Sequence, residues 1–262
     1  MLKTVSPIDN SILVERNFAT DSEIETVLQN AYEARKEWKE TSLRERKEII
    51  NNFVKSFLLN DEEIIENLCK QIGRPIIQCP GEMRGFEERA NYMIDNADRA
   101  LEDLVSRKDS EFDNYIKKEP LGTIFVIAPW NYPFNTSVNS IVPSLLSGNT
   151  VILKHSSQTP LCAEQLFDAA TKASLPKNIF QFLHLNHSST SKVISDYRIN
   201  HVLFTGSVSG GREIKKSIGT RFIGAGLELG GKDPAYVRSD CNLEHAIENL
   251  VDGSYFNSGQ SC

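Results

Sequence analysis

The feature that most restricts the fold is a pattern that holds from Asn114 onward, in which short apolar runs alternate with stretches of helical character. Each run is continuous, rich in β-branched residues and bounded by turn residues, which is typical of strands covered on both faces. Four runs have this character: residues 122–128, 150–155, 179–185 and 201–206. Helices are expected after them, from about Asn135, Pro160, Thr190 and Ser209. The alternation predicts an α/β fold with a doubly wound parallel sheet, in which ligands bind at the carboxyl ends of the strands.

The first hundred residues differ, because charged and apolar residues recur there at helical spacing. Thr20 and Glu23 form a capping-box pattern at the start of the first of four expected helices, and the fourth ends near residue 104. Nothing in this block carries chemistry on its own, so we assign it to scaffolding.

Composition excludes several classes of function. The formal net charge of -6 gives no long-range attraction to phosphate backbones or anionic lipid, so neither nucleic acid nor a membrane is an expected partner. The five cysteines are odd in number and lack Cys-x-x-Cys spacing, which favours a reducing compartment over a disulfide framework or a zinc site. The chain starts without the apolar run of a secretory signal. We therefore expect a cytoplasmic protein, with an organelle as the alternative, and no metal site.

The segments that follow the strands are the candidates for a site. Residues 224–229 lack the third glycine of G-x-G-x-x-G, and residues 206–211 lack the Lys-Ser/Thr of a P-loop. Gly206 nevertheless follows a strand, and Gly210 and Gly211 open a helix whose backbone N–H groups can bind a phosphate. An ordinary βα turn accounts for the same residues, and this segment alone does not separate the two interpretations.

Three polar residues and one thiol stand in unusual surroundings. Asn131, in Pro-Trp-Asn-Tyr-Pro, is either a structural turn residue or an amide held out toward a developing oxyanion. Glu228 lies in an apolar, glycine-rich run, where a carboxylate is either desolvated for general-base work or ion-paired. Lys154, at the end of a buried strand, either reaches solvent or contacts a cofactor. Cys262, taken alone, is an inert thiol.

Taken in order, five segments resemble the aldehyde dehydrogenase superfamily: PWNYP, LKHSSQTP, FTGS, LELGGKDP and FNSGQSC. The resemblance covers the chain from SPIDNSIL to Cys262 and favours the succinate-semialdehyde branch. It implies a five-stranded dinucleotide-binding fold without G-x-G-x-x-G, NAD or NADP as cofactor, and oxidation of a small-molecule aldehyde to the carboxylic acid.

The resemblance also implies a role for each matching residue. Cys262 matches the nucleophile, Asn131 the side-chain donor to the oxyanion, and Glu228 the base that activates the hydrolytic water. The residues that match cofactor-binding positions follow the strand ends: Ile127, Pro129, Trp130, Lys154, Ser156, Ser157, Gly206, Ser207, Gly210, Gly211, Leu229 and Gly230. Among them, Gly206 and Ser207 are implied to contact the pyrophosphate and Lys154 the adenine ribose.

Cofactor choice is predicted from two departures from the family's Lys-Pro-x-Glu pattern. Ser157 replaces the carboxylate that repels a 2′-phosphate, so we expect NADP to be tolerated or preferred. His155 replaces the proline, and a protonated imidazole there would further favour a phosphate. The alternative is that Ser157 only leaves room for the 2′-phosphate, so that both NAD and NADP are accepted.

The resemblance divides the chain into two parts. Residues 1–228 are expected to form the N-terminal helices and the dinucleotide-binding domain, with an extended subunit-contact arm near 111–120. Residues 229–262 are expected to begin a truncated catalytic domain, which puts in doubt both activity and the homo-oligomer typical of the family. Two alternatives follow: a noncatalytic dinucleotide-binding remnant, and a half-enzyme completed by a separate chain.

Overall fold

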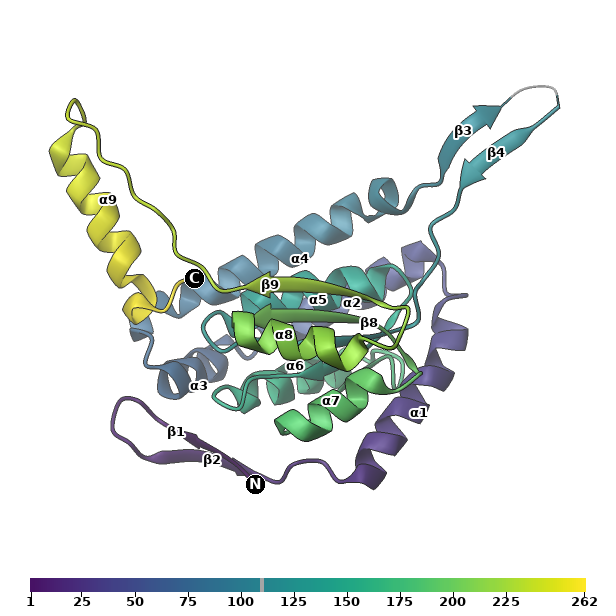
Figure 1. Ribbon diagram of the computed structural model, residues 1–262, viewed down its shortest axis with the longest axis horizontal. Coiled ribbons are helices and arrows are strands. Elements are labelled where there is room, and N and C mark those ends of the chain that lie inside the picture. The colour runs from purple at the N-terminus through teal and green to yellow at the C-terminus, as the bar shows by residue number, and fades with distance from the viewer. Residues whose placement is uncertain (109–110) are drawn as a thin grey trace.

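The computed structural model describes residues 1–108 and 111–262, and a five-stranded sheet lies at its centre (Figure 1). The strand order is β7-β6-β5-β8-β9, and every neighbouring pair is parallel. The strands are β5 (Thr123–Ile127), β6 (Thr150–Lys154), β7 (Phe180–Phe182), β8 (Ile199–Gly206) and β9 (Gly224–Leu229). The predicted doubly wound α/β fold is confirmed. Within this sheet, the pattern of apolar runs did not indicate β9, because its glycines interrupt the β-branched pattern.

Helices cover both faces of the sheet. One layer holds α2 (Leu43–Leu58), α4 (Pro80–Leu101), α5 (Pro133–Leu146) and α6 (Pro160–Lys172); the other holds α1 (Asp21–Trp38), α7 (His187–Ser195) and α8 (Val208–Ile218). Ile124 and Val126 of β5 pack into the first layer, whereas Phe125 and Ile127 pack into the second. Burial of both faces explains why this strand is apolar throughout.

The helices before the sheet begin and end where the local sequence signals predict. Thr20 and Glu23 form the complete capping box of α1, since each side chain accepts a hydrogen bond from the other residue's backbone N–H. Gly73 ends α3 (Asp61–Ile72) with a φ of 69°, a left-handed conformation that favours glycine. A short helix, η1 (Ile76–Gln78), then leads into α4. An unpredicted antiparallel hairpin, β1 (Leu2–Val5) with β2 (Ile12–Arg16), precedes α1.

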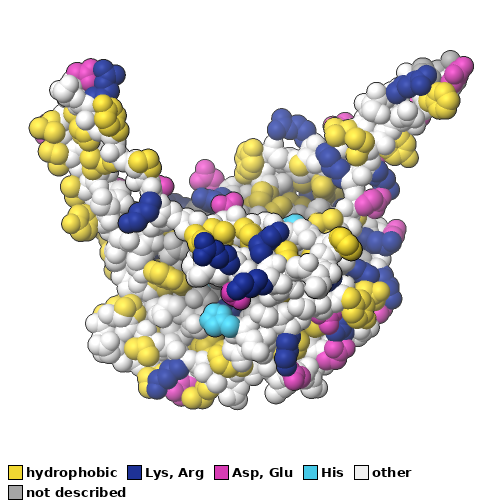
Figure 2. Space-filling view, viewed as in Figure 1, with side chains coloured by type: hydrophobic (Ala, Val, Ile, Leu, Met, Phe, Trp, Pro, Cys, Tyr) yellow, Lys and Arg dark blue, Asp and Glu magenta, His cyan; other side chains and the backbone are white. Residues whose placement is uncertain are grey.

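Two parts of the chain project from this body (Figure 1). One is an antiparallel hairpin of β3 (Leu104–Lys108) and β4 (Asp113–Ile116), whose strand residues are all exposed; the arm expected near 111–120 falls on β4 and the residues after it. The other contains α9 (Leu243–Tyr255), and η2 (Phe256–Gly259) follows it back to the body, where Asn257 is buried. Hydrophobic side chains lie on both projecting parts (Figure 2). Within the described ranges, no helix is long and apolar enough to cross a membrane.

Candidate active site

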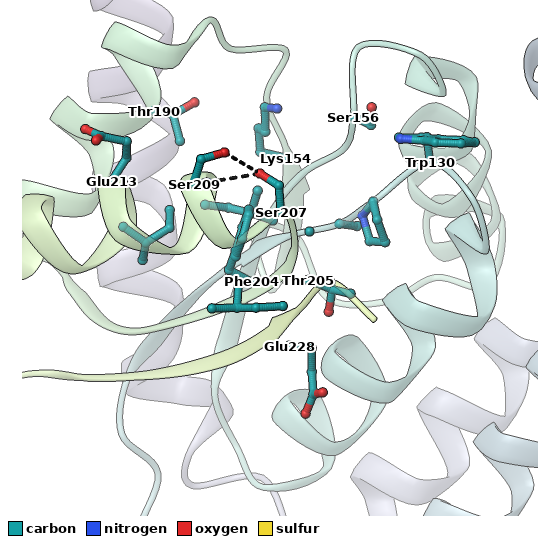
Figure 3. Close-up of a pocket in the computed structure, with 18 of the residues that line it drawn as sticks. Trp130, Lys154, Ser156, Thr190, Phe204, Thr205, Ser207, Ser209, Glu213 and Glu228 are labelled. Atoms are coloured by element: carbon teal, nitrogen blue, oxygen red, sulfur yellow. Dashed lines mark hydrogen bonds between the residues drawn. The ribbon is translucent and has the colours of Figure 1, made fainter. Parts of the chain in front are cut away.

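The carboxyl ends of four strands border a cavity of about 1150 Å³. Ile127 of β5, Lys154 of β6, Gly206 of β8 and Leu229 of β9 line it, and residues of α7 and α8 form another wall (Figure 3). This is the edge of a parallel sheet at which a ligand site is expected.

The cavity collects most of the predicted site residues. Those that line it are Ile127, Pro129, Trp130, Asn131, Lys154, Ser156, Gly206, Ser207, Gly210, Glu228, Leu229, Gly230 and Cys262. Two predicted residues lie outside this lining. Gly211 is buried in α8, where an added Cβ would lie 2.6 Å from the Leu229 side chain, so it permits close helix–strand packing. Ser157 is exposed, and its carbonyl accepts a hydrogen bond of 2.8 Å from the Thr4 hydroxyl.

The turn from β8 into α8 forms a cradle of backbone and hydroxyl groups. Ser207 is the N-cap of α8, and its Oγ accepts from the Gly210 N–H at 3.0 Å and lies 3.0 Å from Ser209 Oγ. A Cβ added to Gly206 or to Gly210 would come within 2.7 Å of the Phe204 ring, so the ring lies against the turn and a side chain at either position would have to displace it. The positive end of a helix with unpaired N–H groups in its first turn suits a phosphate.

Lys154 presents a cation to this cavity. Its side chain is partly buried, and burial lowers the pKa of its ammonium. The Lys154 ammonium forms no hydrogen bond or ion pair with the described residues, and Figure 3 shows the side chain extending between α8 and the Trp130 side of the cavity. A partly desolvated ammonium gains free energy when ligand oxygens replace the lost water.

His155 does not have the predicted role of attracting a phosphate, because its ring points away from the cavity and does not line it. The residue is 3% exposed, and burial lowers the pKa of its imidazole to about 3. Nδ1 accepts the Ser156 N–H at 3.0 Å, which leaves Nε2 to donate to the Pro133 carbonyl at 3.3 Å. The expectation of a protonated imidazole that attracts a phosphate is therefore wrong. The neutral ring instead connects the β6–α6 loop to the start of α5.

Asn131 and Cys262 meet at the other side of the cavity, although 131 positions separate them in the sequence. Asn131 Nδ2 donates to the Gln260 carbonyl at 2.8 Å and lies 4.0 Å from Cys262 Sγ. An amide has two N–H donors, so the second remains directed toward the sulfur. Gly231 also approaches closely, since an added Cβ would lie 2.8 Å from the carbonyl carbon of Cys262. The arrangement places a hydrogen-bond donor beside a thiol, as stabilisation of an oxyanion requires.

Glu228 is exposed, and among the described residues its carboxylate has no ion-pair partner. Figure 3 shows it pointing away from Lys154 and Ser207. Both predicted environments, a desolvated carboxylate and an ion pair, are therefore wrong. The cause is its place on β9, an edge strand that leaves the carboxylate open to water.

One wall of the cavity, which α7 and α8 provide, was not predicted; its lining residues are His187, Ser188, Thr190, Ser191, Ile194, Ser209, Glu213 and Ile214. Four further unpredicted lining residues lie in or just after the strands: Ala128, Phe204, Thr205 and Gly231. A signal was present: Asn186 caps α7 by accepting the Ser189 N–H at 2.8 Å, and a run rich in hydroxyl side chains follows it at a strand end. In the part of the chain that the structure describes, no group of three or more His, Cys, Asp or Glu residues could hold a metal ion.

Known proteins resemble this chain along its whole length. Residues 1–262 match the model of the aldehyde dehydrogenase family. The chain is 30% identical over 259 residues to a succinate semialdehyde dehydrogenase [NAD(P)+] of Escherichia coli K12, covering 99% of this chain and 56% of that relative. It is also 30% identical over 266 residues to a D-glyceraldehyde dehydrogenase (NADP(+)) of Picrophilus torridus, covering 100% and 53%. The chain thus spans little more than half the length of these curated relatives.

Solved structures give the same result. A succinic semialdehyde dehydrogenase from Streptococcus pyogenes, in complex with NADP+, superposes with a TM-score of 0.94 at 27% identity, over 100% of this chain and 58% of that one. A 3,6-anhydro-L-galactose dehydrogenase superposes with a TM-score of 0.93 at 29% identity, over 99% and 55%. With a family match along its whole length and the fold of solved members, the chain belongs to the aldehyde dehydrogenase family.

Proposed function

We propose that this chain carries the cofactor site and the nucleophile of an NAD(P)-dependent aldehyde dehydrogenase that oxidises a small aldehyde to its carboxylic acid. The observation that carries the proposal is a single cavity lined both by the Ser207–Gly210 cradle with Lys154 and by Asn131 with Cys262. Binding groups and a thiol beside a hydrogen-bond donor are the two requirements for this chemistry.

The cradle and Lys154 are proposed to hold the cofactor. The first turn of α8 fits the pyrophosphate, because Gly206 and Gly210 keep the backbone free of side chains there. Lys154 would donate to the ribose hydroxyls or to a 2′-phosphate. The ligand oxygens would then be the hydrogen-bond acceptors that the ammonium does not find among the described residues. When bound, the oxidised nicotinamide supplies the hydride acceptor. The names of relatives that use NADP(+) or NAD(P)+ support either cofactor for this chain.

Cys262 is proposed to attack the carbonyl carbon of the aldehyde as a thiolate. The carbonyl oxygen becomes an oxyanion, which Asn131 Nδ2 and the backbone N–H of Cys262 would stabilise. One such donor contributes about 3 kcal/mol in comparable sites. After oxidation, Cys262 would hold the acyl group as a thioester.

Release of the product is assigned to Glu228. Its exposed carboxylate would accept a proton from a water molecule, and that water would add to the thioester carbonyl carbon. The acid then leaves and Cys262 returns to its free form. Because the Glu228 carboxylate points away from the cofactor cradle, it would have to turn toward Cys262 before this step (Figure 3).

The substrate class is proposed from the named relatives. The E. coli relative acts on succinate semialdehyde and the P. torridus relative on D-glyceraldehyde, both small polar aldehydes. We propose a semialdehyde, such as succinate semialdehyde, for this chain.

The test is to incubate the purified chain with NAD or NADP and a panel of aldehydes that includes succinate semialdehyde. Absorbance of the reduced cofactor reports turnover, and thermal unfolding reports binding. The proposal predicts cofactor-dependent stabilisation together with turnover that requires an aldehyde. No stabilisation by either cofactor would contradict it.

A second candidate is a noncatalytic dinucleotide-binding protein. It is favoured by the exposed, outward-pointing Glu228 and by α9, where every residue is at least partly exposed. Stabilisation by cofactor without turnover on any aldehyde would support this alternative.

A further inference from the structure

A buried arginine lies directly behind the two loops that carry Asn131 and Cys262. Arg74 is 1% exposed and forms an ion pair through Nη1 with Glu82, whose side chain is also buried. Its Nε donates to Asn257 Oδ1 at 2.6 Å, and its Nη2 donates to the backbone carbonyl of Asn131 at 2.7 Å. One guanidinium therefore contacts both loops of the candidate active site.

The loop before Cys262 depends on such contacts because its backbone is strained. Asn257 and Ser258 both have a φ of 55°, and Gly259 follows with a φ of 73°. Left-handed backbone is unfavourable for residues with a Cβ, so two in succession persist only where the surroundings hold them. Asn257 is held on three sides: Arg74 contacts its Oδ1, Gln78 Oε1 accepts its N–H at 2.8 Å, and its own amide donates to the Asn131 carbonyl at 2.9 Å.

Glu82 extends the same network to the start of α5. Its Oε1 accepts the backbone N–H groups of Phe134 and Asn135 at 2.9 and 3.0 Å. Tyr132 is the N-cap residue of α5, and its side chain forms no capping hydrogen bond with the described residues. Glu82, a residue of α4, caps the helix instead. The Arg74–Glu82 pair thus fixes α5 immediately after Asn131.

We propose that Arg74 is a positioning residue that sets the distance between the Asn131 amide and the Cys262 sulfur by holding both loops with one guanidinium. The inference rests on the proposed function for its catalytic consequence, but the positioning itself can be tested without turnover. A planar guanidinium presents five donors in a rigid fork, whereas a lysine ammonium is a single point charge. Lysine at this position would keep the charge facing Glu82 but could not also contact Asn131 and Asn257.

The direct test is hydrogen exchange, followed by mass spectrometry, of peptides that cover residues 256–262 in the full chain. The variants are Arg74→Lys and Asn257→Gly, the second of which tolerates the left-handed turn while removing the contacted side chain. The matched control is Arg198→Lys: Arg198 is 4% exposed and paired with Asp196 and Glu25, but it lies before the amino end of β8, whereas the cavity lies at the carboxyl ends of the strands.

We expect exchange in residues 256–262 to be about tenfold faster in both site variants and unchanged in Arg198→Lys, because a lost hydrogen bond to a charged group changes an equilibrium by about this factor. Protection of β5 and β6 should stay as in the parent chain. Unchanged exchange in a folded Arg74→Lys chain would overturn the proposal. If Arg74→Lys does not fold, exchange in residues 256–262 of Asn257→Gly is compared with the parent chain, and unchanged exchange there would overturn the proposal. An equal rise in all peptides would show a purely structural role.

Turnover provides the second measurement. Arg74→Lys should lower kcat about 100-fold and change the KM for the cofactor by less than about threefold, since misplaced reacting groups slow chemistry more than binding. A parallel loss in kcat and cofactor binding would contradict positioning. If the parent chain itself shows no turnover, the proposed function fails for this chain, while the exchange experiment still decides the role of Arg74.

Discussion

The central sheet and residues 231–262 are held in place by different kinds of interaction. All five residues of β5 are buried between two helical layers, whereas Asn257 is the single buried residue among the described residues 231–262. A buried aliphatic side chain contributes about 1.5–3 kcal/mol, and a typical hydrogen bond contributes about 1 kcal/mol net. Apolar burial therefore fixes the centre of the sheet beside the cofactor cradle, whereas the candidate nucleophile rests on a few polar contacts.

This difference implies that cofactor binding and the reaction at Cys262 depend on different parts of the molecule. Groups proposed to bind the cofactor lie at the ends of strands that packing fixes, so binding should survive changes in the last segment. Cys262 depends on the turn at residues 257–259, so chemistry should be sensitive to small changes there. Variants in both regions test whether binding and chemistry separate in this way.

The largest effect is expected for Cys262→Ser. Turnover should fall by about 10⁴-fold or more, because the reaction needs the thiolate, while cofactor-induced thermal stabilisation should stay unchanged. Absorbance of the reduced cofactor and thermal unfolding measure the two quantities. Cys241→Ser is the matched control, since Cys241 is an exposed thiol in the same segment but not part of the cavity lining. Turnover that persists in Cys262→Ser would assign the nucleophile to another residue.

Acid should destabilise the sheet region through His155. Its folded pKa of about 3 lies below the ordinary value of 6.5, so between these limits the unfolded chain binds a proton that the folded chain does not. The stabilisation is complete above pH 6.5 and is lost as pH falls toward 3, by at most about 1.4 kcal/mol per pH unit.

His155→Gln tests this effect in urea unfolding between pH 7 and pH 4. We expect the variant to lose less free energy of unfolding than the parent chain over this range. His245→Gln, at an exposed position on α9, should keep the parent's pH dependence. Parallel pH curves for the parent and His155→Gln would show that the acid effect comes from other groups.

Two glycine substitutions compare the regions directly. Gly210→Ala brings a Cβ to 2.6 Å from the Phe204 ring and should weaken cofactor binding about tenfold while costing about 1–3 kcal/mol of stability. Gly253 on α9 has open space around it within the described structure, so Gly253→Ala should leave binding unchanged and stabilise the helix by about 1 kcal/mol. Cofactor titration and urea unfolding check both. Equal cofactor affinity in the two variants would contradict the proposal that the turn from β8 into α8 binds the cofactor.

The smallest effect is expected for Ser157→Glu. A carboxylate there should lower NADP affinity about tenfold by repelling the 2′-phosphate and leave NAD affinity nearly unchanged, because only NADP carries that group. Ser157→Gln has the same size without the charge and should bind both cofactors alike. Fluorescence titration with each cofactor distinguishes the outcomes. A loss of NADP affinity in both variants would point to size and not charge, which favours the interpretation that Ser157 only leaves room.

The sequence predicted those parts of the fold that local patterns determine. β5 and β6 were identified because burial on both faces makes a strand apolar throughout, and α1 because its capping box is local. β9 was missed because Gly224 and Gly226 lie close to the His201 and Leu203 side chains of β8, a requirement of packing that no local pattern reveals.

Most of the predicted site residues, Asn131 and Cys262 among them, line one cavity, and their roles remain predictions. The surroundings of two predicted residues differ from those expected. The exposure of Glu228 depends on its edge strand, and the direction of the His155 ring depends on the Pro133 carbonyl of another element. Such properties arise from contacts between distant segments, so a single sequence does not reveal them.

The hydrogen bond from Thr4 to the Ser157 carbonyl has a practical consequence for measuring cofactor preference. Thr4 is fully buried and Leu2 nearly so, while Gln158 Nε2 also donates to the Val5 carbonyl at 3.2 Å, so the N-terminal hairpin braces the loop that follows β6. An affinity tag fused next to Met1 would adjoin this hairpin and disturb its hydrogen bonds to the loop that follows β6. Titrations that compare NAD with NADP should therefore use protein from which an N-terminal tag has been cleaved.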